Sequence, residues 1–160
     1  MLTTEQQAIV KADILADGVL NAFPANSDGA WGIAALYNFA ADPEWIVWKT
    51  NVDPDEIMRN GMDWTRVDNL SVGKARVWDW MTKLGTFDAS RLNIRAGIEE
   101  VWQGSPGDLV VREVVYTHSK RAATRIETLL ATGTGTNESP ATMSFEGAIS
   151  YQDVMSARNS

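Results

Sequence analysis

The sequence predicts a mainly α fold: a small helical bundle with a long C-terminal helix, a minor extended or β-hairpin element and a flexible C-terminal arm. Three observations lead to this prediction. Apolar residues recur at steps of three and four along most of the chain. Helix start and stop signals punctuate it repeatedly. One Gly/Thr-rich stretch near the C-terminus has almost no apolar residues. We therefore divide the 160 residues into a helical body over 1–131 and a flexible arm over 132–160 that holds a short strand or hairpin.

The first five helices are predicted from their caps. A Ser, Thr, Asn or Asp accepts hydrogen bonds from the first free N–H groups of a helix, and proline fits the first helical position. Glycine ends a helix because it adopts left-handed backbone at little cost. These signals place helices from Thr3 to Gly18, from Ser27 to before Asp42-Pro43, from Asp53-Pro54 to Gly61, from Asn69 or Ser71 to Gly85, and from Ile94 to Gly104.

A long sixth helix is predicted from Ser105 to Ala131. Ser105 and Pro106 form its start signal. Its apolar stripe advances by three or four residues at every step: Val111, Val115, His118, Ala122, Ile126 and Leu129. Residues Thr117 to Ser119 are poor helix formers, so a kink is predicted there.

Two segments are typical of extended structure. Residues Glu44 to Val52 are rich in β-branched and aromatic side chains, which favour a strand. Residues Ala141 to Tyr151 alternate around Glu146-Gly147, a candidate hairpin turn. The Gly/Thr arm before them cannot bury enough surface to offset its ordering entropy, so we expect it to be mobile in the free protein.

Composition limits the function classes. The formal charge of −7 disfavours a broad nucleic-acid-binding face, since phosphate contacts need clustered Lys and Arg. Without cysteine there is no disulfide and no thiolate metal ligand. No apolar run is long enough to span a membrane, and the N-terminus has no secretion signal, which favours synthesis in the cytoplasm. Seven tryptophans are more than a core of this size requires, which leaves aromatic side chains for interfaces. The three at 78, 80 and 102 are expected in the core, and Leu84 shares the apolar face of its helix with Val77, Trp80 and Met81.

No catalytic set is recognisable in the sequence, and we predict no enzyme, no cofactor and no metal site. His118 is the only histidine and lies in an apolar stripe, which predicts a packing or polar-network role. The acidic residues of Asp53 to Glu56 are explained by helix capping. Val72 to Ala75 lacks the upstream glycine and the Ser/Thr of a P-loop, and Gly133 to Gly135 has no dinucleotide-binding context.

Six residues are predicted at partner interfaces. Lys120, Arg121 and Arg125 form the one basic cluster. It is either a solvated helix face or a contact with an acidic neighbouring subunit or with passing DNA. In the arm, an apolar anchor such as Phe145 is predicted to fill a pocket of a neighbouring subunit. The predicted interface residues are Arg121, Arg125, Met143, Phe145, Ile149 and Tyr151.

Several stretches resemble a family of small virion-morphogenesis proteins of tailed bacteriophages and prophages. They are MDWTRVDNLSVGKARVWDWM (Met62 to Met81), NIRAGI (Asn93 to Ile98), KRAATRIETLLATGTGT (Lys120 to Thr136) and SPATMSFEGAISYQDV (Ser139 to Val154). In size and layout the chain also resembles the helical head–tail connector proteins, or adaptors. That resemblance implies a ring of copies below the portal, with a helical body and a C-terminal arm that reaches neighbouring subunits.

The leading hypothesis is therefore a phage structural protein, most simply a head–tail connector adaptor located in the virion. Its expected partners are copies of itself, the portal and other neck, tail or capsid proteins, with neither sequence-specific nucleic acid nor a membrane. A capsid-decorating, minor head or tail-terminator protein is the alternative in the same context. A small phage enzyme is the alternative from another class, and a soluble regulatory or anti-host protein that acts through its aromatic surface is a third.

Overall fold

Ten helices and two pairs of short strands make up the part of the chain that the computed structural model describes, residues 1–83 and 85–160. The predicted mainly α class is confirmed. The chain forms two compact units. Unit 1 comprises Met1–Ile46 and Ala122–Ser160, and unit 2 comprises Val47–Arg121. This division differs from the predicted body over 1–131 and arm over 132–160, because the C-terminal residues pack with the N-terminal helices.

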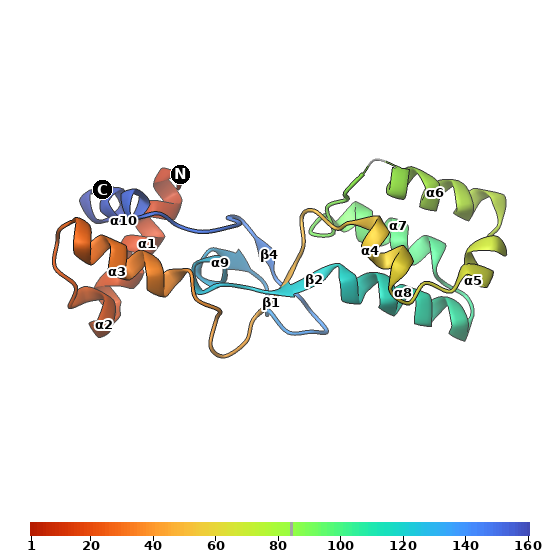
Figure 1. Cartoon of the computed structure of the whole chain (residues 1–160), viewed down its shortest axis with the longest axis horizontal. Coiled ribbons are helices and arrows are strands. Elements are labelled where there is room, and N and C mark those ends of the chain that lie inside the picture. The colour runs from red at the N-terminus through yellow and green to blue at the C-terminus, as the bar shows by residue number, and fades with distance from the viewer. Residues whose placement is uncertain (84) are drawn as a thin grey trace. The chain divides into compact units, whose positions relative to one another are not determined.

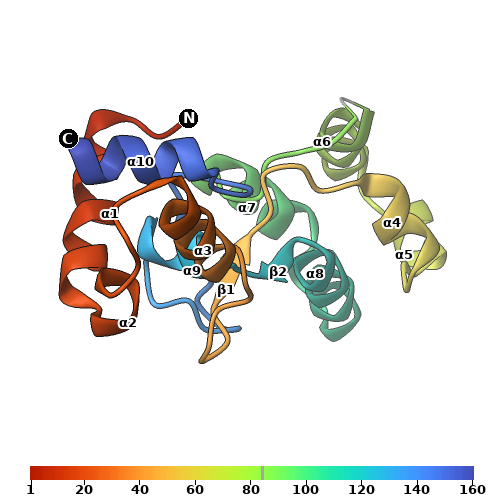
Figure 2. The ribbon, with the colours of Figure 1, turned by 60° about the vertical axis from the view of Figure 1, so that its left-hand side comes forward.

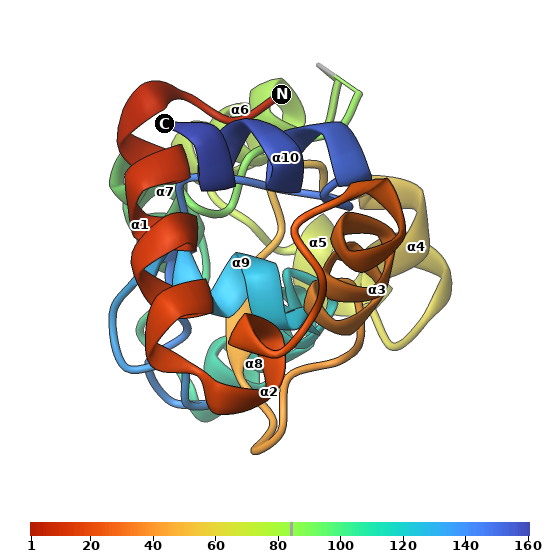
Figure 3. The ribbon, with the colours of Figure 1, turned by 90° about the vertical axis from the view of Figure 1, so that its left-hand side faces the viewer.

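Unit 1 is a cluster of helices from both ends of the chain. Helix α10 packs against α1 and α3, and α9 contacts α3 (Figures 2 and 3). The elements are α1 (Thr4–Ala16), α2 (Gly18–Asn21), α3 (Ser27–Tyr37), α9 (Arg125–Leu129), β3 (Ala131–Thr132), β4 (Thr142–Met143) and α10 (Tyr151–Asn159).

The caps of unit 1 largely follow the predicted signals. Thr3 and Gln6 form the expected capping box at the start of α1. Asn26, one residue before the predicted Ser27, caps α3. Asp17 caps α2 through the N–H groups of Val19 and Leu20, so α1 ends just before Gly18. The helices bury one continuous apolar core, which includes Val10, Ile14, Leu20, Ile33, Tyr37, Ile126, Ile149 and Val154.

The described residues of unit 2 include five helices, in which α7 contacts both α6 and α8 while α4 and α5 pack on α8 (Figure 1). Asp53 with Pro54 starts the first of them, as predicted, and Gly61 follows its end with a φ of 106°. Asp63 caps a short helix that the sequence analysis missed. The helices are α4 (Pro54–Arg59), α5 (Trp64–Asp68), α6 (Val72–Lys83), α7 (Leu92–Val101) and α8 (Pro106–His118).

Two buried tryptophans centre the core of unit 2. Trp78 and Trp102 meet edge to face with their ring centroids 5.3 Å apart, and both are almost fully shielded from solvent. Around them lie Trp48, Ile57, Met81, Ile98, Val101, Val111 and Val115. Leu84, predicted on the apolar face of α6, lies outside the described residues.

The chain crosses between the units through two short strands that pair with each other. They are β1 (Ile46–Trp48), which confirms the strand predicted within Glu44 to Val52, and β2 (Lys120–Ala122). Beside this pair, Ala123 N–H donates to the Trp45 carbonyl within unit 1, and Lys49 N–H donates to the Ser119 carbonyl within unit 2.

The predicted long helix from Ser105 to Ala131 is wrong, because it breaks after His118. Ser119 is fully buried and its hydroxyl donates to the Val115 carbonyl at 2.7 Å. The next three residues form β2 instead of another helical turn. Helix α9 then starts with a capping box formed by Thr124 and Glu127. This T-x-x-E signal is present in the sequence, but the apolar periodicity that continues through it predicted an unbroken helix.

The segment predicted as an arm is packed into unit 1. The β pairing joins Ala131 to Met143 and Thr132 to Thr142, so Glu146-Gly147 is not a hairpin turn. The Ile46 N–H donates to the Gly135 carbonyl, and the Ala141 N–H donates to the Ile46 carbonyl. Gly135 of the Gly/Thr stretch and Ala141 just after it thus both hydrogen-bond the residue that starts β1.

Candidate interaction surfaces

The four predicted interface residues in the C-terminal segment all make contacts within unit 1. Ile149 is 2% exposed and belongs to the core, and Phe145 packs half-buried against that core. Tyr151 stacks on Trp31 with ring centroids 4.7 Å apart, and Met143 lies in β4 opposite Ala131. From the sequence, Phe145 is predicted to fill a pocket of a neighbouring subunit, whereas its ring packs within unit 1. A partner contact through it stays a prediction.

Side-chain hydrogen bonds connect the same segment to the N-terminal helices and to α9. Asn38 donates to the Ile149 carbonyl and accepts from the Ile149 N–H, both at 2.9 Å. Gln6 donates to the Ser144 carbonyl, and Glu127 accepts from the Gly147 N–H. These bonds satisfy backbone groups that no helix or sheet would pair.

Arg125 is engaged within unit 1. Its guanidinium donates to Asp17 at 2.7 Å and to Asp13 at 3.3 Å, and lies over the Tyr37 ring. The hydrogen bond from Arg125 holds the pKa of the Asp17 carboxyl below its usual value. Burial, together with a hydrogen bond donated to Asp13, raises the pKa of the Tyr37 hydroxyl. The other members of the predicted basic cluster are in β2, where Lys120 lies over the Trp48 ring and Arg121 follows it.

His118 ends α8 and connects it to α4. Its Nδ1 lies 3.4 Å from a carboxylate oxygen of Glu56, and its Nε2 lies 3.1 Å from the Asn60 carbonyl oxygen. These contacts fit the predicted polar-network role. Among residues 1–83 and 85–160, no three His, Asp or Glu side chains gather as metal ligands would, and no helix is long and apolar enough to cross a membrane.

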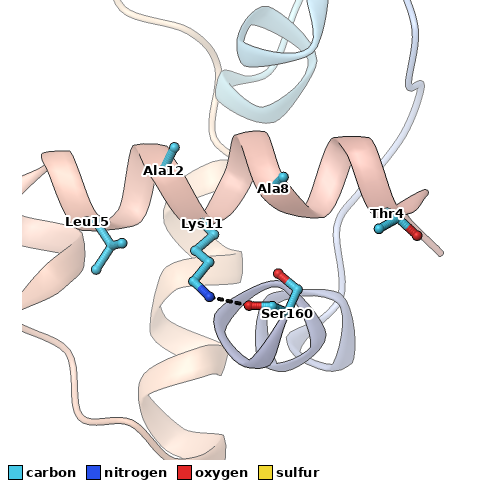
Figure 4. A pocket seen from close by; sticks show the side chains of 6 residues that line it. All are labelled: Thr4, Ala8, Lys11, Ala12, Leu15 and Ser160. Carbon is cyan, nitrogen blue, oxygen red and sulfur yellow. Dashed lines mark hydrogen bonds between the residues drawn. The ribbon is translucent and has the colours of Figure 1, made fainter.

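A shallow hollow of about 350 Å³ lies beside α1 (Figure 4). It is lined mainly by methyl and methylene groups of Ala8, Ala12 and Leu15. Its one cation, Lys11, is bonded to the backbone oxygen of Ser160. Its polar lining consists of Thr4, Lys11 and Ser160, with Lys11 and Ser160 bonded to each other, so the hollow presents no catalytic group.

An exposed aromatic stripe on unit 1, which we call the α3 face, consists of Trp31, Ala35 and Phe39. Trp31 and Ala35 are one helical turn apart, and Phe39 follows the end of α3. Trp31 is 59% exposed and Phe39 63%. Monomeric proteins seldom expose large contiguous apolar patches, so this face is a candidate contact site.

A second exposed stripe, the α6 face, consists of Val72, Arg76 and Trp80, spaced four residues apart on one helix. Val72 is 77% exposed and Trp80 65%. The prediction that Trp80 belongs to the core is therefore wrong. Two residues turn a helix by about 200°, so burial of Trp78 directs Trp80 outward. That phase difference was the signal that the sequence analysis missed.

The net charge of the chain resides in unit 1. That unit has ten acidic residues (Asp and Glu) and three basic ones (Lys and Arg), which gives a net charge of −7. Unit 2 has eleven acidic and eleven basic residues, which gives a net charge of zero. All three cations of unit 1 are engaged internally: Lys11 bonds Ser160, Arg125 bonds Asp13 and Asp17, and Arg158 bonds carbonyls including that of Pro24. Unit 1 is therefore an acidic body without an unengaged cation.

No protein-family model, curated protein or solved structure matches this chain.

Proposed function

We propose that this chain is a structural protein of a tailed-phage virion and acts as a head–tail connector adaptor, assembling as a ring of copies below the portal. The proposal takes its context from the stretches within Met62 to Val154 that resemble phage morphogenesis proteins. One structural observation supports it most: each of the two units exposes large apolar side chains, the α3 face on unit 1 and the α6 face on unit 2.

A subunit inside a ring requires two contact surfaces, one for each neighbour, and a further surface for the layer above or below. Two separate apolar faces on two units meet the first requirement. The acidic unit 1 fits a conduit for DNA, since carboxylates at the surface repel phosphates and let the duplex pass without adhesion. The partners are accordingly copies of this chain, the portal and the proteins of the neck.

The test is a phage or prophage that has a stop codon early in the gene for this chain. We expect filled or emptied heads that fail to join tails, with joining restored by the intact chain supplied from a plasmid. Quantitative mass spectrometry of purified virions should give a copy number that matches the portal. A copy number that follows the major capsid protein indicates decoration, recovery with free tails indicates a tail terminator, and absence from virions contradicts the proposal.

A further inference from the structure

We infer that the α3 face of one copy docks on the α6 face of the next copy. This inference rests on the proposed function, because it assigns the surface through which the ring would close. The occupant of the α3 face is then a second copy of this chain, bound head to tail and not face to face.

Charge complementarity selects this pairing. Asp28 lies one turn before Trp31 on α3, and Asp42 follows Phe39 by three residues. Both carboxylates are exposed, and neither has a cationic partner among the residues that the structure describes. The α3 face thus has the Asp28 carboxylate one turn away on the same helix and Asp42 shortly after it in the chain, on a unit whose three cations are all engaged. Two copies of this face brought together would place like charges opposite each other, which disfavours a symmetric pair.

The α6 face supplies the opposite charge. Arg76 lies between Val72 and Trp80, is exposed, and has no acidic partner among residues 1–83 and 85–160. The nearby cation Lys83 is already paired with Asp79 at 2.7 Å. An arginine between apolar neighbours fits an aromatic stripe with acidic flanks, because a guanidinium can stack on an indole ring and bind a carboxylate.

The lengths of the two helices and the sizes of their exposed side chains also favour this pairing. Helices α3 and α6 have 11 and 12 residues, so they can lie alongside each other over nearly their whole length. Ala35 is a small side chain between two large rings, and the space above it can receive a large side chain from a facing helix. Because the two faces differ, each subunit keeps one free face after the first contact, and the contact propagates until a ring or filament forms.

The absence of cysteine allows a clean test. Ala35→Cys places one thiol on the α3 face. Gly73→Cys places another beside the α6 face, where an added side chain meets open space. The full-length double variant is treated with a short bismaleimide at rising protein concentration and in purified virions. We expect a ladder of covalent dimers, trimers and larger species, whereas each single variant stays monomeric.

Three outcomes would overturn the inference. A dimer from Ala35→Cys alone means that two α3 faces meet. A crosslinked monomer of the double variant means that the faces meet within one chain. An equal ladder from the matched control Ala35→Cys with Glu113→Cys, whose second thiol lies on the exposed side of α8, means that the linkage is unspecific.

Sedimentation of point variants provides the second readout. Trp31→Lys and Arg76→Glu should each weaken self-association roughly tenfold to a hundredfold, and a mixture of the two should give heterodimers, since one intact face remains on each. Trp64→Lys, at an exposed tryptophan outside both faces, is the matched control and should associate normally. Circular dichroism verifies that all variants fold.

The two proposals can fail separately. The chain could be present in virions at the copy number of the portal and yet give no ladder of crosslinked species there. That result would support the proposed function and overturn this inference. A ladder of crosslinked species from the purified protein, together with absence of the chain from virions, would support this inference and contradict the proposed function.

Discussion

The indole ring of Trp45 lies so close to Gly135 that no side chain fits between them. A Cβ added at Gly135 would come within 2.1 Å of the ring, and the residue has a φ of 66°. Trp45 precedes β1, and Gly135 belongs to the Gly/Thr stretch, so the contact joins two distant parts of the chain within unit 1. The glycine that made this stretch look mobile is required by its packing.

Gly135→Ala is therefore expected to destabilise unit 1 strongly. Gly147→Ala is the matched control, because its φ of 101° is also unfavourable for alanine while its surroundings are open. Strain at such a backbone costs about 1–3 kcal/mol. The clash with Trp45 adds to that, so Gly135→Ala should lower the free energy of unfolding by more than Gly147→Ala does in urea denaturation. Equal effects would show that the ring moves aside freely.

Phe145→Ala is expected to lower the stability of the isolated chain by about 2 kcal/mol, less than the loss at a fully buried phenylalanine. Its ring packs half-buried against the core of unit 1. Val19→Ala, at a 65% exposed side chain, is the control and should change stability little. Thermal unfolding measures both. An unchanged midpoint for Phe145→Ala, with loss of assembly, would restore the hypothesis that this ring anchors a neighbouring subunit.

Local signals in the sequence predicted most helices correctly, and long-range packing explains the failures. The caps at Thr3, Asp53 and Ser105 act within four residues and were recognised. At the break, the Ser119 carbonyl accepts from the Lys49 N–H, which is far away in sequence, and apolar periodicity carries no information about such a contact. The low apolar content of the Gly/Thr stretch likewise does not reveal that the Trp45 ring packs directly against Gly135. Among the candidate surface residues, Trp80 was predictable from its phase relative to Trp78.

Asp17→Asn should remove part of the acid sensitivity of the chain. The pKa of Asp17 in the folded protein is below its ordinary value of 3.8, with the Arg125 hydrogen bond as the largest cause. A lowered pKa gives stability that is present above the ordinary value and lost as the pH falls through the folded value. Denaturation at a series of pH values below 5 should therefore show a shallower loss for Asp17→Asn, which keeps a capping oxygen for α2.

Arg125→Met is the companion variant in that experiment, because it removes the largest cause of the lowered pKa and leaves the carboxyl in place. The double variant should lose no more acid sensitivity than Asp17→Asn alone, since Arg125 acts on the titration through the Asp17 carboxyl. Additive effects on the acid sensitivity would mean that Asp17 and Arg125 contribute independently.

His118→Gln should cost about 1 kcal/mol of stability without loss of any metal binding. The imidazole contacts Glu56 and Asn60 through two separate nitrogens, and a glutamine side chain has only one nitrogen for both. Glu113→Gln, on the exposed side of α8, is the control and should be nearly neutral. Urea denaturation measures the difference. A stoichiometric zinc site in calorimetric titration that disappears in His118→Gln would contradict the structural role.

Trp102→Ala should destabilise unit 2 by about 3–5 kcal/mol, the range for truncation of a large aromatic core residue. The side chain is fully buried and meets Trp78 edge to face, so its removal leaves a cavity and an unsupported second indole. Trp64→Ala, at a 61% exposed ring, is the matched control and should stay within about 0.5 kcal/mol of the parent.

Amide hydrogen exchange on Trp102→Ala adds a spatial test, because the two units have separate cores. Protection should fall within Val47–Arg121 well before it falls in α1, α3 and α10, and an equal loss in both would mean that the units unfold as one.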